Sequence, residues 1–312
     1  MKLLSLAVLA CALAALPAGV AAKKVAVKIE TSSPTPDADA PFIAKSLVLA
    51  PERVAGFELR GATDYPGQPL LGVSLNYAHA DLPEMTLHLF VYPIGRVTRE
   101  QALAQVMREV REGIDMRLGQ SLDGRVDYGE ETSLDLGRVE EDGSLRPESA
   151  PAAVPPPAEG DENARVLAVF AQADDDLSPQ RGRELPLQLA FDGRSMDSVA
   201  FAFYRGLYLF KGRATVNVGV VPAETLHRVA RRAMAVLVPA IEVRNTGSCT
   251  KLEIQVDTKG SEDAMQEQLL RGMAASHLRG ELENCAAELD ATVPLGMRAL
   301  PLEFPPGTWQ QP

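Results

Sequence analysis

The chain has 312 residues, with 42 acidic against 31 basic side chains and a formal net charge of −11. Proteins bind nucleic acid chiefly by neutralising phosphates with Lys and Arg, so this acidic balance argues against a nucleic-acid partner. The length allows one large domain or two smaller ones.

The chain begins with a segment typical of a secretory signal. Lys2 precedes an apolar run over residues 3–16, and residues 20–22 are small, as a signal peptidase requires. The run is shorter than the ~20 apolar residues that span a bilayer. We therefore expect cleavage after Ala22, a periplasmic or secreted protein, and no transmembrane segment after cleavage. Lipid attachment at Cys11 is the alternative.

Two segments rich in Pro, Ser and acidic residues contain little that could be buried. We expect residues 23–41 to be a flexible lead-in. Residues 146–163 hold three successive prolines and predict a disordered surface loop, with a domain linker as the alternative. An α+β domain is then expected over residues 42–241, followed by a small unit over residues 242–312.

Strands are the main feature of the α+β domain. Residues 70–78 and 85–93 predict two strands joined by a turn in the sequence HADLPE. The second strand has a wholly apolar face and a mixed face, as in an antiparallel sheet covered mainly on one side. The apolar face consists of Met85, Leu87, Leu89 and Val91. Further strands are predicted over residues 165–172 and 185–191, and a hairpin over residues 198–218 with its turn near Arg205 and Gly206.

Two amphipathic helices are predicted, one after the strand at residues 85–93 and one after the hairpin at residues 198–218. Thr98 and Gln101 form a capping-box pattern, apolar residues follow at helical spacing to Leu118, and Gly119 can end the helix. We expect this helix to lie on the apolar face of the sheet. A second helix begins at Pro222 and carries its buried stripe over residues 226–237.

Strand runs followed by a long amphipathic helix, twice over, predict an α+β fold in which an antiparallel sheet is layered with helices. In outline this resembles the PsbP/Mog1 type of α/β sandwich, a resemblance of architecture that implies no function.

The C-terminal unit is predicted to be strand, helix and strand. A strand is expected over residues 251–257, a helix from Ser261 to about Arg279 that ends at Gly280, and a strand over residues 297–304. A unit this small has little core of its own, so a covalent link within it would stabilise its fold.

Cys249 and Cys285 could be a redox pair, two metal ligands or a disulfide. The chain has no CxxC motif, and the nearest histidine is His277, so neither a thioredoxin-like pair nor a metal site is favoured. Disulfides persist in the oxidising compartment that the signal implies. We expect a disulfide that stabilises the fold by about 3–4 kcal/mol through loop closure.

Catalytic motifs are absent from the sequence. It contains no G-x-S-x-G, H-E-x-x-H, Walker A, G-x-G-x-x-G or EF-hand pattern, and we expect no cofactor. His79 and Asp81 share a predicted loop and are the candidate catalytic pair. The three aspartates over residues 174–176 are interpreted as a solvated turn rather than a calcium site, because the alternating ligands and turn glycine are missing.

Aromatic and basic residues gather in the predicted hairpin and in the helix that follows it. Within an acidic protein, such a cluster could bind an anionic ligand or an acidic partner. The alternative is that its aromatics pack and its cations pair with nearby carboxylates. The candidate ligand-binding residues are Tyr204, Arg205, Tyr208, Lys211, Arg213, Arg228, Arg231 and Arg232.

Together these observations predict an exported, non-enzymatic protein that binds a protein partner or a component of the cell envelope. A carrier of small or lipidic molecules, with a cavity between sheet and helices, is one alternative. An envelope hydrolase using scattered residues such as His79 and Asp81 is another.

Overall fold

The computed structural model describes most of the chain from residue 42 onwards. The described residues are 26–28, 42–121, 123–147, 166, 168, 178–250, 253–255 and 261–309. The expected signal segment at 1–22, most of the lead-in, the Pro-rich segment from 148 to 163 and the acidic turn at 174–176 lie outside these residues.

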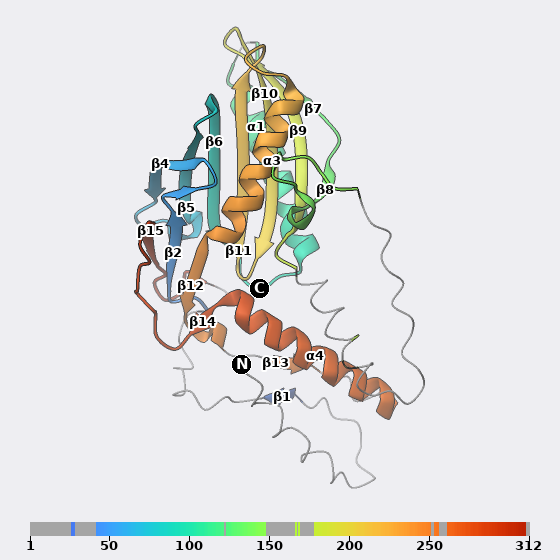
Figure 1. The fold of residues 1–312 in the computed structure, drawn as a ribbon. Coiled ribbons are helices and arrows are strands. Elements are labelled where there is room, and N and C mark those ends of the chain that lie inside the picture. Colours follow the sequence, from blue (N-terminus) through green and yellow to red (C-terminus); the bar gives the residue numbers. More distant parts are fainter. Residues whose placement is uncertain are drawn as a thin grey trace.

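A large antiparallel sheet forms the centre of the fold (Figure 1). Its order is β3-β4-β5-β6-β11-β10-β9-β7, with β8 paired to β9 as well. The strands are β3 (Arg53–Val54), β4 (Phe57–Asp64), β5 (Val73–His79), β6 (Leu82–Pro93), β7 (Arg125–Tyr128), β8 (Thr132–Asp135), β9 (Arg181–Phe191), β10 (Arg194–Arg205) and β11 (Tyr208–Asn217).

A four-stranded sheet packs beside it and has the order β14-β12-β2-β15. Its strands are β2 (Lys45–Pro51), β12 (Glu242–Thr246), β14 (Cys285–Ala286) and β15 (Met297–Glu303), and a separate pair joins β1 (Ala26–Lys28) to β13 (Glu253–Gln255). The predicted C-terminal succession of strand, helix and strand is present, but β2 from the preceding domain lies between β12 and β15. The expected boundary after residue 241 therefore crosses a sheet.

Three long α-helices belong to the described fold: α1 (Arg99–Leu118), α3 (Ala223–Ala240) and α4 (Glu262–Glu283). Short 3-10 helices lie at Pro69–Leu71, Leu136–Arg138 and Ser248–Thr250. The capping box between Thr98 and Gln101 is confirmed. Gly280 does not end α4, which continues to Glu283 and stops at Asn284 in a left-handed conformation. In the described part of the chain, no helix combines the length and the apolarity needed to cross a membrane.

The two hairpins differ in how closely they follow the sequence. The hairpin of β10 and β11 turns at Gly206, as expected. The turn between β5 and β6 is much tighter than predicted, because His79 already pairs with Leu82 and leaves only two residues between them. Of the strand predicted over residues 165–172, only residues 166 and 168 are described, and both are helical.

The apolar face of β6 is confirmed, but α1 does not cover it. The side chains of Met85, Leu87, Leu89 and Val91 share a buried core with α3. Gly212, which pairs with Leu89, allows α3 to approach so closely that an added Cβ would lie 2.5 Å from the sulfur of Met234.

The helix α1 packs on the opposite face, mainly against β9 and β10 (Figure 1). The prediction that α1 covers the apolar face of β6 was wrong. Strand alternation identifies the two faces of a sheet, but it does not show which helix packs on each face. The four-stranded sheet lies on the same side as α3, where the Tyr77 hydroxyl of β5 donates to the Pro51 carbonyl at 2.9 Å. The central sheet is thus covered by α3 and the four-stranded sheet on one side, and by α1 over part of the other side.

Candidate functional site

The part of the central sheet that α1 leaves uncovered lies over β5, β6 and β11. On this side of the sheet, the leucines of β9 and two alanines of β10, Ala200 and Ala202, are buried under α1. By contrast, the residues on the same face of β5 and β6 are only half-buried and include Asn76, His88 and Phe90. None of the helices that the structure describes covers this part of the sheet, so within the described part of the chain it is open to a partner.

Strand register places two cations side by side on this surface. Arg213 of β11 pairs with His88 of β6, and Lys211 pairs with Phe90. Residues two apart on one strand point to the same face about 7 Å apart. We call His88, Phe90, Lys211 and Arg213 the sheet patch.

Arg213 is the central cation of the sheet patch. Its Nε donates to the hydroxyl of Ser198 at 3.2 Å, and that hydroxyl is 2.8 Å from the Thr215 hydroxyl. No carboxylate in the described part of the chain pairs with this guanidinium. Burial, together with the positive charge of Arg117, lowers the pKa of Arg213. The site therefore holds a partly desolvated cation that an anion would stabilise.

Lys211 is held against two aromatic rings. Its Nζ lies 5.2 Å from the ring centroid of Phe90 and 5.5 Å from that of Tyr92, within the range of cation–π attraction. The Tyr92 hydroxyl donates to Glu109 of α1 at 3.1 Å. Burial lowers the pKa of Lys211, and Glu109 partly opposes this. The ammonium is thus positioned by rings rather than by a direct ion pair.

His88 adds a titratable group beside Arg213. Burial and the charge of Arg213 both lower the pKa of its imidazole from the ordinary value of 6.5. The ring stacks with Phe90 at 6.4 Å between centroids. At neutral pH His88 is therefore a neutral donor or acceptor within a positively charged surface.

Sequence reasoning identified Lys211 and Arg213 but missed His88 and Phe90. The alternation of β6 places both on its mixed face, which is the only sequence signal available. That this face adjoins Lys211 and Arg213 depends on the pairing of β6 with β11, segments more than a hundred positions apart.

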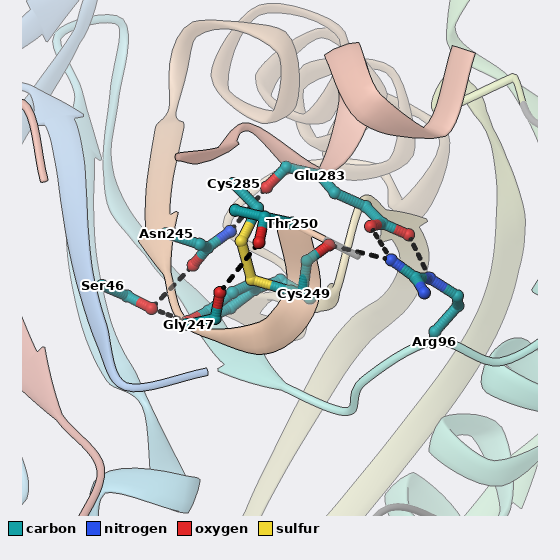
Figure 2. The surroundings of a disulfide bond; sticks show 9 residues. Ser46, Arg96, Asn245, Gly247, Cys249, Thr250, Glu283 and Cys285 are labelled. Atoms are coloured by element: carbon teal, nitrogen blue, oxygen red, sulfur yellow. Dashed lines mark hydrogen bonds and ion pairs between the residues drawn. A yellow bond between two sulfur atoms is a disulfide. The ribbon is translucent and has the colours of Figure 1, made fainter. Parts of the chain in front are cut away.

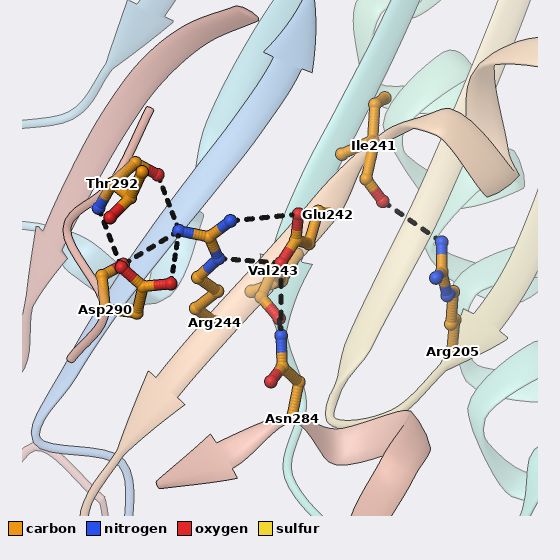
Figure 3. Close-up of polar contacts among 8 residues, drawn as sticks. All are labelled: Arg205, Ile241, Glu242, Val243, Arg244, Asn284, Asp290 and Thr292. Atoms are coloured by element: carbon orange, nitrogen blue, oxygen red, sulfur yellow. Dashed lines mark hydrogen bonds and ion pairs between the residues drawn. The ribbon is translucent and has the colours of Figure 1, made fainter. Parts of the chain in front are cut away.

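The other predicted residues of the hairpin have structural roles. Tyr208 is buried, and its hydroxyl donates to Ser46 at 2.5 Å. Arg205 binds carbonyls at the end of α3, with Nη1 3.0 Å from the oxygen of Val238. The same atom lies equally far from the oxygen of Ile241, the residue that follows the helix (Figure 3). Arg205 neutralises the negative end of that helix. Tyr204 donates to the Gly95 carbonyl at 2.9 Å and lines a separate cleft.

The three predicted arginines of α3 lie on the other side of the central sheet. Arg231 forms a buried ion pair with Glu184 at 2.7 Å, and Arg228 lies 3.7 Å from Asp142. Arg232 acts on His79 through its charge. The eight candidate residues therefore do not converge on one site, because α3 packs against the face opposite the sheet patch.

His79 and Asp81 are not arranged as a catalytic dyad. The backbone N–H of Asp81 donates to Nδ1 of His79 at 3.3 Å, which closes the turn. The imidazole is buried against Phe57, with ring centroids 4.6 Å apart, and burial lowers its pKa. The Asp81 carboxylate is exposed to solvent instead.

Cys249 and Cys285 form a disulfide with their Cα atoms 6.0 Å apart. Figure 2 shows the polar network around it, in which Asn245 donates to the Glu283 carbonyl at 2.7 Å and accepts from Ser46. On the other flank of β12, Arg244 binds Glu242 and the carbonyls of Asp290 and Thr292 (Figure 3). The disulfide thus lies within a network that fixes β12 and the end of α4.

No family model and no curated protein matches this chain. The solution structure of a cyanobacterial PsbP protein from Synechocystis aligns with 64% of this chain and 92% of its own, at 11% identity and a TM-score of 0.32. A type VII secretion system chaperone of Mycobacterium tuberculosis, in complex with a PE–PPE dimer, aligns with 62% of this chain and 72% of its own, at 11% identity and a TM-score of 0.12. At these TM-scores neither likeness supports an inference of function.

Proposed function

We propose that the chain is an exported, non-enzymatic binding protein that docks an acidic segment of a protein partner on the sheet patch. The observation that carries this proposal is that Arg213 is half-buried without a carboxylate partner in the described part of the chain. Its side chain also lies close to that of Lys211. Buried charges in proteins are normally paired, so an acidic side chain from outside would complete this site.

The shape of the surface favours a protein partner over a small molecule. The sheet patch is an open surface formed by strands. Its Phe90 ring, next to Lys211, offers an apolar contact for a partner whose acidic side chains pair with the two cations. The complementary charges would also speed encounter with an acidic surface.

The proposed location in the periplasm or outside the cell is supported by two features. The first residues have the composition of a secretory signal. The disulfide between Cys249 and Cys285 is typical of oxidising compartments. A hydrolase based on His79 is less favoured, because its imidazole is buried and engaged in a turn.

The test is binding of a fluorescently labelled octaglutamate peptide, measured by anisotropy at two salt concentrations. Lys211→Gln combined with Arg213→Gln should weaken binding about tenfold or more, since each contact is a charge-assisted hydrogen bond. Raising the salt concentration should weaken binding to the unmodified protein, because exposed charges are screened.

The matched control is Arg228→Gln combined with Arg232→Gln, which changes the net charge equally on the opposite side of the sheet. It should leave binding within about twofold of the unmodified protein. An equal loss in both double variants would mean that net charge alone drives binding and would overturn the site. Binding to phosphatidylglycerol vesicles but not to the peptide would overturn the assignment of a protein partner.

A further inference from the structure

A cleft of about 310 Å³ lies away from the sheet patch, between the start of α1, the turn of β10 and β11, and the end of α4. Its polar lining includes Arg96, Arg99, Tyr204 and Arg279, and its apolar lining includes Val97 and Leu282. Ligand cavities in proteins begin at about this size, so the cleft suits a small molecule.

The walls of the cleft are held firmly in place. Arg96 donates to both carboxylate oxygens of Glu283, at 2.8 and 2.5 Å. The Gly206 turn touches the last turns of α4, where an added Cβ would lie 2.5 Å from the Leu282 carbonyl oxygen. The Tyr204 hydroxyl is fixed between Gly95 and Val97. A preformed cavity loses little entropy when a ligand binds.

The charge balance of the lining favours an anion. Glu283 is neutralised by Arg96, and Glu100 lies 2.8 Å from Arg183. Arg279 lines the same cleft and has neither an ion pair nor a hydrogen bond with any described residue. Its charge reaches Tyr204, where it partly opposes the burial that raises the pKa of that phenol to about 12. The positive N-terminal end of α1 opens into the same space.

We propose that this cleft binds a small molecule with one carboxylate attached to an apolar group. The carboxylate would pair with Arg279 near the start of α1, and the apolar group would lie against Val97, Leu282 and the ring of Tyr204. Two sources have this chemistry: a medium-chain fatty acid, and the C-terminal residue of an apolar peptide. The proposal is independent of the sheet patch, which shares no residue with the cleft.

Calorimetry with octanoate, N-acetyl-leucine and the neutral octanamide tests this proposal on the full chain after removal of the signal. At least one carboxylate should bind, and octanamide should bind at least tenfold more weakly than octanoate if the fatty acid is the ligand. Preference for N-acetyl-leucine over octanoate would assign the cleft to a peptide terminus instead. The absence of binding by both carboxylates would overturn the proposal.

Substitutions then locate the site. Arg279→Gln should weaken binding of the carboxylate at least tenfold. Arg271→Gln is the matched control, because it lies on the same helix two turns earlier, where it pairs with Glu267 outside the cleft. Equal affinities for both variants would overturn the assignment. Lys211→Gln with Arg213→Gln should leave carboxylate binding unchanged, so failure here and failure of the proposed function are distinguishable.

Discussion

Arg96 and Glu283 form a buried, two-pronged ion pair that joins the loop after β6 to the last residue of α4 (Figure 2). Only 3% of the Glu283 side chain and 27% of the Arg96 side chain are exposed. The same guanidinium donates to the carbonyl of Cys249 at 3.1 Å. One arginine therefore links the central sheet, the disulfide and α4.

Removing this arginine should destabilise the protein strongly. Arg96→Met leaves the Glu283 carboxylate buried without its partner, and such a change lowers the free energy of unfolding by about 3–5 kcal/mol. Urea denaturation followed by circular dichroism measures it. Arg271→Met, which removes an exposed pair, should cost less than about 1 kcal/mol. Similar losses in both variants would show that the Arg96 pair is not effectively buried.

The disulfide should stabilise the folded protein by closing a loop and so restricting the unfolded chain. Its cysteines are 36 positions apart, which corresponds to about 3–4 kcal/mol in the chain-entropy account. Replacing both cysteines by serine should lower the urea midpoint accordingly and raise the slope somewhat, because the unfolded chain loses the cross-link that kept it compact. The intact mass of protein exported to a bacterial periplasm should be two hydrogens below that of the dithiol. A full dithiol mass would contradict the bond.

The titration of His88 should depend on Arg213. Burial and Arg213 lower the imidazole pKa in the folded protein below the ordinary 6.5. The unfolded chain therefore binds more protons, and the contribution of His88 to stability is lost as pH falls from about 6.5 towards the folded pKa. Arg213→Gln should raise the pKa of His88 in an NMR titration, because it removes a like charge. Arg228→Gln should not change it.

The sheet patch should bind its partner more strongly at lower pH. A carboxylate next to Arg213 favours the protonated form of His88, so binding takes up a proton. Affinity for the octaglutamate peptide should then rise as pH falls through the His88 titration, while the peptide remains ionised. His88→Gln should remove this pH dependence. If the affinity of the unmodified protein does not change across the pH range in which NMR shows His88 to titrate, His88 does not contact the bound anion.

The Gly206 turn should tolerate no side chain. Gly206 has φ +62°, and an added Cβ would meet α4 at 2.5 Å. Gly193, in the turn between β9 and β10, has φ +70° but open space around it. Gly193→Ala should cost only the backbone strain, about 1–2 kcal/mol. Gly206→Ala should lower the stability measured by thermal denaturation more than Gly193→Ala does. Equal losses of stability in the two variants would mean that α4 moves aside easily.

Local sequence patterns predicted the elements whose determinants lie within a few residues. The capping box at Thr98 fixed the start of α1, and alternation identified the apolar face of β6. The end of α4 was mispredicted, because a glycine within a helix lowers helical propensity without breaking the helix when later contacts hold it. Those contacts, from Glu283 to Arg96, come from a distant part of the chain.

The sequence by itself determined the acidic composition, the alternation of the strands and the helix starts, and it favoured a disulfide between Cys249 and Cys285 that the structure contains. The tertiary structure decided which helix covers which face of the sheet, and so separated Arg213 from Arg231 while bringing it beside His88. The physical reason is that periodicity is a local property of the backbone. Register and layer order depend on packing between segments far apart in the chain, which no local pattern contains.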